Sequence, residues 1–424
     1  MLLAINGGSP YITKEFTPYN SIGREELKAA AEVVESGVLS GYIGRAGEFF
    51  LGGPKVREFE EIVADYFGVR HAISVNSWTS GLIAGIGSFQ MEPGDEVIVS
   101  PWTMCASATS ILHWNAIPVF ADIDPVTLCL DPRSVESRIS DRTRAIMSVD
   151  IGGHPADTDA LNALAEKHNL QIMSDTAQAP GAKNADRFAG TLTDVGGYSL
   201  NYHKHIHTGE GGVVVTNDAD LALRAQMIRN HAEAVVDSVD PKYLSNMVGY
   251  NFRLGEIEAA IGIEQMKKLS RAVAGRQAAA EKLISGLSGL EGLSLPKTLD
   301  GYTHAYYMFF MEIDHTKTGV PRDRICDALR AEGVPGLGTK FENLHLLPMF
   351  QQKIAFGSGG IPWTADFCTN DIDYSKGICP VAERLHDESY LGFQMCLHEM
   401  REHELDAMIG AFHKVWDNLD ELIT

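Results

Sequence analysis

Residues 199–212 read Ser199-Leu-Asn-Tyr-His-Lys204-His-Ile-His-Thr-Gly-Glu-Gly-Gly212 and join two short predicted strands. The Gly-Glu-Gly-Gly turn that follows Lys204 disfavours a helix, so we expect the lysine at the edge of a sheet. A lysine in such a place is suited to Schiff-base chemistry, because partial burial lowers its pKa and makes the neutral amine available. A solvated loop lysine is the competing interpretation.

On both sides of this stretch, between about residues 24 and 270, short β-branched runs alternate with amphipathic helices, which is typical of βαβ units around a mostly parallel sheet. The predicted strands are 71–75, 96–99, 118–121, 145–149, 170–173 and 212–216, and the clearest helices are 55–67, 158–168 and 218–230. Helical stretches at 256–269 and 271–287 lead out of this region. A strand at 306–313, a helix at 322–332, a loop-rich segment at 335–380 and a closing helix at 398–415 follow. We therefore predict a large α/β domain with an N-terminal arm over residues 1–270 and a smaller α+β domain over 271–424.

Composition narrows the possible functions. The 424 residues are 45% hydrophobic and 21% charged, as in an ordinary globular protein. Their net charge of −21 disfavours nucleic acid and anionic membranes as partners. The six cysteines lie far apart without a CxxC pair, and we find neither a signal peptide nor a membrane-spanning stretch. We expect a cytoplasmic protein.

Two further stretches carry chemistry. Asp175 ends the apolar run Ile172-Met-Ser-Asp175, and a carboxylate at the carboxyl end of a strand could keep a pyridine nitrogen protonated. Ser77-Trp78-Thr79 precedes the helical stretch 81–87, so hydroxyls and backbone N–H groups there form a candidate phosphate site. Each also has a plain structural interpretation, Asp175 as a helix N-cap and the hydroxyl residues as turn and cap residues.

Five more stretches complete a pattern: Gly53-Pro-Lys-Val-Arg-Glu-Phe-Glu60, Pro93-Gly-Asp-Glu-Val-Ile98, Pro118-Val-Phe-Ala-Asp-Ile-Asp124, Gly249-Tyr-Asn-Phe-Arg253 and Cys379-Pro-Val-Ala-Glu-Arg-Leu385. With Asp175-Thr-Ala-Gln-Ala179 and Thr208-Gly-Glu-Gly-Gly212, in this order, they resemble the DegT/DnrJ/EryC1/StrS family of sugar aminotransferases. The resemblance covers almost the whole chain. It implies fold type I, dependence on pyridoxal 5′-phosphate (PLP), and transfer of an amino group from glutamate or glutamine to a keto sugar.

The resemblance also implies roles for individual residues. Lys204 matches the Schiff-base lysine, which moves a proton between the substrate carbon and C4′ of the cofactor. Asp175 matches the acid that pairs with the pyridinium nitrogen, and Gln178 the residue near the ring oxygen. Phosphate contacts fall on Ser77, Thr79 and Ser199, and on Asn251, which matches an asparagine that reaches the neighbouring subunit's cofactor. The resemblance thus implies a homodimer with shared active sites.

Two residues depart from the family pattern. Trp78 stands where the family usually has glycine, so the approach of the backbone to the phosphate is expected to differ. Met104 stands where an aromatic side chain commonly stacks on the cofactor ring. Trp102 is an alternative stacking residue if the loop permits it, because side chains two apart on an extended segment share a face.

His203, His205 and His207 suggest a metal site by the same spacing. No fourth ligand accompanies them, so we expect no metal and interpret them as site-lining or structural residues. A related subgroup of dehydratases has histidine in place of the Schiff-base lysine. Counting back from Thr208-Gly-Glu-Gly-Gly212 aligns Lys204 with that position, which favours transamination.

For the acceptor we expect 8-oxo-3,8-dideoxy-octulosonate, giving 8-amino-3,8-dideoxy-manno-octulosonate for lipopolysaccharide. A nucleotide-linked keto sugar and scyllo-inosose are the alternatives within the same enzyme class. The carboxylate of the octulosonate requires one or two cations in the outer site, and the candidates are Lys55, Arg57, Arg229 and Lys340. A non-catalytic regulator that binds PLP or a sugar is the alternative of another class.

Overall fold

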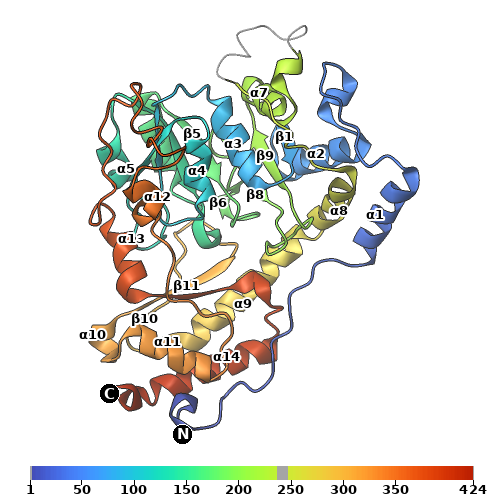
Figure 1. The fold of residues 1–424 in the computed structure, drawn as a ribbon. Helices are drawn as coiled ribbons and strands as arrows, with labels where there is room; N and C mark the ends of the chain where they lie inside the picture. The colour runs from blue at the N-terminus through green and yellow to red at the C-terminus, as the bar shows by residue number, and fades with distance from the viewer. Residues whose placement is uncertain (1, 236–246, 424) are drawn as a thin grey trace.

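A seven-stranded sheet is the largest sheet of the computed structural model, which describes residues 2–235 and 247–423, and it lies in the upper part of the view in Figure 1. The strand order is β1-β9-β8-β5-β4-β2-β3. All neighbouring strands are parallel except that β9 runs antiparallel to β1 and to β8. The strands are β1 (His71–Val75), β2 (Glu96–Val99), β3 (Ile117–Phe120), β4 (Thr143–Val149), β5 (Gln171–Asp175), β8 (Val195–Ser199) and β9 (Gly212–Thr216). The predicted α/β fold is confirmed.

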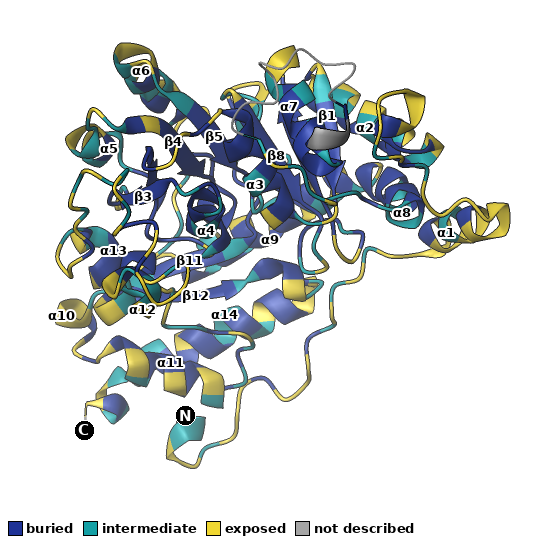
Figure 2. Cartoon of the chain, turned by 45° about the horizontal axis from the view of Figure 1, so that its top comes forward, coloured by how far each residue is buried: buried dark blue, intermediate teal, exposed yellow. Residues whose placement is uncertain are grey.

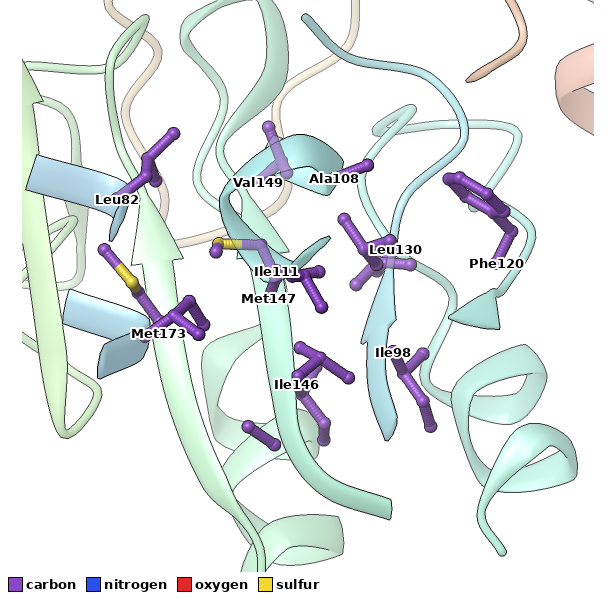
Figure 3. Close-up of a cluster of buried hydrophobic side chains, with 14 of the residues drawn as sticks. Leu82, Ile98, Ala108, Ile111, Phe120, Leu130, Ile146, Met147, Val149 and Met173 are labelled. Atoms are coloured by element: carbon purple, nitrogen blue, oxygen red, sulfur yellow. The ribbon is translucent and has the colours of Figure 1, made fainter. Parts of the chain in front are cut away.

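Helices cover both faces of this sheet, and the alternation along β9 shows why. Val213 and Val215 pack into a cluster with Phe59 of α2, whereas Val214 points the opposite way, into a cluster with Leu82 of α3. Helices α2 (Pro54–Phe67) and α8 (Glu256–Met266) belong to the first layer, and α3 (Trp78–Ser88), α4 (Ala106–Leu112) and α7 (Ala219–Arg229) to the second. Figure 3 shows side chains of α3 and α4 packed against strands of the sheet. Helices α5 (Pro132–Arg138) and α6 (Thr158–His168) complete this part of the chain.

A second sheet and a second core lie beside α9 (Leu269–Leu287), which runs away from the central sheet, and we call this part of the chain the small domain. It contains a three-stranded antiparallel sheet, β10-β11-β12, packed with helices around its own core. The elements are β10 (Leu293–Ser294), β11 (Met308–Ile313), β12 (Tyr390–Gln394), α10 (His315–Thr318), α11 (Arg322–Ala331) and α14 (Glu402–Trp416). The short elements α12 (Pro348–Gln351), α13 (Pro380–Arg384), β6 (Lys183–Asn184) and β7 (Arg187–Phe188) lie in the loops of the two domains.

Part of the loop-rich segment packs against the large domain. Leu344, Phe350, Tyr374 and Cys379 belong to the same buried cluster as the central strands. The Tyr374 hydroxyl donates to the carbonyl of Pro118 at 2.7 Å. The division of the chain at residue 270 stays a prediction.

The N-terminal arm lies along the small domain, and its residues Leu3, Ile12 and Phe16 belong to the hydrophobic core of that domain. Helix α1 (Arg24–Ser36) then packs on α8 and leaves much of its outer surface exposed (Figure 2). Across residues 2–235 and 247–423, no helix combines the length and the apolar character needed to cross a membrane.

Candidate active site

A cavity of about 350 Å³ opens at the carboxyl ends of β4 and β5, where open α/β sheets bind their ligands. Its wall includes residues from α3, β5, the loop after β8 and Tyr307, which directly precedes β11. Eight of the nine residues predicted for the site line it: Ser77, Trp78, Thr79, Met104, Asp175, Gln178, Ser199 and Lys204. The ninth, Asn251, is not among the lining residues.

Lys204 lies in the wall of this cavity and is only 7% exposed, so it is not a solvated loop lysine. Burial lowers the pKa of its amine to about 8, although the negative charge of Asp175 acts in the opposite direction. The ring of Tyr307 covers the amine, with Nζ 4.1 Å from the ring centroid. A useful fraction of neutral amine is therefore available near neutral pH.

Asp175 ends β5 with its carboxylate held from two sides. Oδ1 accepts from the indole Nε1 of Trp78 at 2.7 Å and from the backbone N–H of Ala177 at 3.3 Å. Oδ2 accepts from the Ser107 hydroxyl at 2.7 Å. No helix begins after Asp175, so the N-cap interpretation is wrong.

The amino end of α3 faces the same cavity. Ser77 caps the helix by accepting from the N–H of Ser80 at 3.1 Å, and Thr79 lies in the first turn. Ser199 closes the wall from the end of β8. Backbone N–H groups and hydroxyls at the positive end of an eleven-residue helix are suited to hold a phosphate.

The side chain of Trp78 leaves this helix end open because it turns inward, between Gly81 and Gly197. Gln178 is oriented by its backbone contact: its Oε1 accepts from the N–H of Gly152 at 2.7 Å. The amide nitrogen of Gln178 is therefore the end left to donate to a ligand, which suits the predicted contact with a ring oxygen.

Trp102 is not available to stack on a ligand. It is completely buried, stacked on Phe341 at 4.9 Å between ring centroids and edge-on to Tyr390 at 5.5 Å. The alternative stacking role for Trp102 is thus wrong. Met104 lines the cavity and is 60% exposed, so it remains the candidate for that wall.

The three histidines around Lys204 point in different directions, because residues 201–207 form turns instead of a strand. His203 lines the cavity, where burial lowers its pKa to about 4. His205 is buried and its Nε2 contacts the carbonyl of Ala305, and Nδ1 of His207 accepts from the N–H of Gly209. The shared face expected from their spacing does not form.

The candidate cations for a substrate carboxylate lie elsewhere. Lys55 pairs with Glu58 and Arg57 with Glu48 on the surface. Arg229 is fully buried against Glu60, and Lys340 is exposed away from the cavity. The expectation that they line the outer site is therefore wrong: over the described ranges, Lys204 is the only lysine or arginine that we find in the cavity wall.

Other residues of the site had not been predicted from the sequence. Ser107 holds Asp175, Tyr307 covers Lys204, and Asn201 donates to Glu210 at 2.9 Å on the cavity rim. Glu210 belongs to the Gly-Glu-Gly-Gly turn and could have been found there. Ser107 and Tyr307 carry no local signal, since only the packing of α4 and β11 brings them to the site.

The donors present fit PLP. The start of α3, with its hydroxyls, suits the phosphate of PLP, and the buried carboxylate of Asp175 suits the ring nitrogen. The amide nitrogen of Gln178 suits the ring oxygen, and the buried amine of Lys204, with its lowered pKa, suits the aldehyde.

Known proteins share both the sequence and the fold. A family model, described as the DegT/DnrJ/EryC1/StrS aminotransferase family, matches residues 23–387. L-glutamine:scyllo-inosose aminotransferase of Streptomyces griseus is 33% identical over 99% of both chains. GDP-perosamine synthase of Caulobacter vibrioides is 33% identical over 78% of this chain and 89% of its own. The crystal structure of an aminotransferase from Psychrobacter cryohalolentis superposes with a TM-score of 0.81 at 28% identity, covering 96% of this chain and 100% of that one. The chain therefore belongs to the DegT/DnrJ/EryC1/StrS aminotransferase family, and it is a PLP-dependent enzyme that acts on sugars.

Proposed function

We propose that this enzyme aminates a keto sugar that carries no nucleotide, and that its acceptor is 8-oxo-3,8-dideoxy-octulosonate, with glutamate or glutamine as donor. The product would be 8-amino-3,8-dideoxy-manno-octulosonate for lipopolysaccharide. Transamination itself is supported most directly by Lys204 and Asp175 in one cavity. With Gln178 in the same wall, a non-catalytic regulator is no longer a useful alternative.

Each residue has a distinct task in such a reaction. PLP, when bound, supplies an electron sink for the carbon that exchanges its amino group. Lys204 would hold the cofactor covalently and, once released by the incoming amine, carry a proton to or from the reacting carbon through Nζ. Asp175 would keep the ring nitrogen protonated, and the end of α3 with Ser77 and Thr79 would anchor the phosphate. Tyr307 would keep water from the amine.

The charges around the cavity support an acceptor without a nucleotide. Its wall carries the carboxylates of Asp175 and Glu210 but, as far as the structure describes the chain, only the cation of Lys204. A diphosphate there would meet more repulsion than compensation. A single carboxylate needs less positive charge than a diphosphate. Nε of Arg253 donates to Oδ1 of Asn251 at 2.7 Å, so an Asn251 that reaches the partner's site would bring the cation of Arg253 with it.

A cyclitol ketone is the second candidate. The scyllo-inosose aminotransferase of Streptomyces griseus matches this chain along nearly its whole length. A cyclitol is uncharged, so it would need no cation from the site. The match to GDP-perosamine synthase, whose name indicates a nucleotide-linked sugar, covers 78% of this chain and so less than the match to the scyllo-inosose aminotransferase.

The acceptor can be tested with three ketones. Purified enzyme loaded with PLP and glutamate is given 8-oxo-3,8-dideoxy-octulosonate, scyllo-inosose or a nucleotide-linked 4-keto sugar, and the aminated products are measured by mass spectrometry. We expect the octulosonate to have the highest kcat/KM, by about tenfold or more, which corresponds to about 1.4 kcal/mol. Turnover of the nucleotide sugar alone would exclude the proposal.

We also propose a homodimer that shares its two sites. Leu27 and Val34, seven residues apart, lie on one face of α1 and are 70% and 58% exposed, and Val38 and Leu39, just after the helix, are 50% exposed each. Apolar side chains so exposed are costly to leave in water and suit a second copy. Asn251 is exposed outside its own cavity, which fits a role in the partner's site.

The dimer predicts the effect of charge on α1. Leu27→Asp with Val34→Asp should convert a particle of twice the chain mass into a monomer in light scattering, and should weaken PLP retention about tenfold or more, because Asn251 would no longer reach the phosphate. Val126→Asp, at an exposed apolar position elsewhere, is the control. A variant that stays dimeric would contradict this interface.

The lowered pKa of Lys204 predicts how cofactor uptake depends on pH. Apo-protein should take up PLP faster as pH rises, with half the maximal rate near pH 8, because only the neutral amine attacks the aldehyde. Burial favours the neutral amine of Lys204, whereas Asp175 and Cys396 favour its ammonium form. The other groups that face Lys204 are His203 and Tyr307. Stopped-flow absorbance over pH 6 to 10 measures the midpoint, and a value near 10.5 would show an amine that is not buried.

A further inference from the structure

Trp78 lies in a slot made by glycines. A Cβ built on Gly81 would lie 2.6 Å from Cε3 of the indole, and one on Gly197 would lie 2.3 Å from Cη2. Real side chains do not approach so closely, so both positions must lack a Cβ for the indole to fit. Gly81 meets the indole first, whereas Gly197 also lies against the backbone carbonyl of Val213 in the neighbouring strand β9.

The slot aims the polar edge of the ring at Asp175. Nε1 is the only hydrogen-bonding atom of the indole, and it donates to Oδ1 at 2.7 Å in a fully buried contact. The Ser107 hydroxyl of α4 donates to Oδ2 at the same distance. Each carboxylate oxygen therefore has its own neutral donor, from a different helix, and the plane of the carboxylate cannot turn without breaking one contact.

We propose that Trp78 is a positioning residue: its indole N–H, together with Ser107, fixes the Asp175 carboxylate in the plane that meets the ring nitrogen of the cofactor. The two donors also share the negative charge of Asp175, so less of it acts on Lys204. This role concerns the cofactor that the family uses and does not depend on which acceptor is correct.

A purely structural role for Trp78 predicts different behaviour. If the indole only fills the slot, Trp78→Phe should act through lost packing alone, and Ser107→Ala, which removes a donor with little change in volume, should leave the pH midpoint and the PLP affinity unchanged. If the N–H holds Asp175, Trp78→Phe should also alter the electrostatics of the site. Loss of a donor leaves more uncompensated charge on Asp175, which favours the ammonium form of Lys204.

Trp114 offers a matched control. Its Nε1 also donates in a buried position at 2.8 Å, but to the carbonyl of Ile83, and it lies just beyond the end of α4. Trp114→Phe therefore makes the same change from indole to phenyl and removes an N–H that donates to α3, without touching Asp175. Ser107→Ala removes the second donor with a much smaller change in volume.

The experiment compares wild type, Trp78→Phe, Ser107→Ala and Trp114→Phe. For each, we measure apo-protein melting, the pH midpoint of PLP uptake and the PLP dissociation constant. We expect Trp78→Phe and Ser107→Ala to move the midpoint upward by about half a pH unit or more and to weaken PLP binding about tenfold, the scale of a hydrogen bond to a charged group. Trp114→Phe should change melting alone.

Two outcomes would overturn the proposal. One is a folded Trp78→Phe protein with the wild-type midpoint and PLP affinity. The other, which decides the matter if Trp78→Phe does not fold, is Ser107→Ala with both values unchanged. Because neither readout requires a sugar acceptor, a wrong acceptor assignment would leave both unaffected.

Discussion

Replacing Lys204 with alanine should lower kcat by about 10³-fold to 10⁴-fold while leaving the fold intact. Among the described residues that line the cavity, His203 is the histidine, and its pKa of about 4, lowered by burial, makes it a poor proton acceptor near neutral pH. Asp175 and the end of α3 would remain, so the variant should still bind PLP without a covalent bond.

The measurement has two parts. Borohydride reduction and peptide mapping should place the cofactor on residue 204 in wild type and nowhere in Lys204→Ala, and amination of the keto sugar should disappear with it. Lys167→Ala is the control, since Lys167 of α6 is an exposed lysine that pairs with Glu136 of α5 and does not line the cavity. A label on another residue, or full turnover in Lys204→Ala, would remove the basis of the mechanism.

The sequence predicts the sheet well because its strands carry local signals. The predicted strands 71–75, 96–99 and 212–216 coincide with β1, β2 and β9, and buried β-branched runs between turns leave few other choices. The helix that follows Ser77 begins at Trp78, three residues earlier than expected, since Ser77 caps it. The closing helix begins at Glu402 instead of 398, because Met400 adopts a positive φ of 57° that no helix accommodates.

The polar site is predictable only in part, for a physical reason. Asp175 ends β5, Ser77 caps α3, and Lys204 lies in the turns between β8 and β9 just before the Gly-Glu-Gly-Gly stretch, so each carries a local signal. Ser107 and Tyr307 reach the site through long-range packing, and the fate of Trp102 depends on Phe341, which is distant in sequence. The spacing of the three histidines suggests a common face only if their segment is a strand, and it is not.

Asp175→Asn should lower kcat at least about a hundredfold, the scale of losing one preorganised electrostatic contact in a buried site. Asparagine has nearly the shape of aspartate, so the Trp78 indole can still donate to the remaining carbonyl oxygen. What is lost is the negative charge, without which the cofactor ring has no reason to keep its proton. Turnover with glutamate is the first readout. Asp194→Asn is the control, because Asp194 binds the backbone N–H of Ile172 at the opposite end of β5.

The second readout of Asp175→Asn is the pH midpoint of PLP uptake, and here the sign is decisive. Asp175 raises the pKa of Lys204, so removing its charge should move the midpoint below the value near 8. Trp78→Phe, which exposes more of that charge to Lys204, should move it upward. General loosening of the site would move both variants in the same direction, toward the ordinary pKa of lysine. Opposite shifts require that Asp175 act on Lys204 through its charge and that Trp78 hold part of that charge; an upward shift in Asp175→Asn would contradict the pairing.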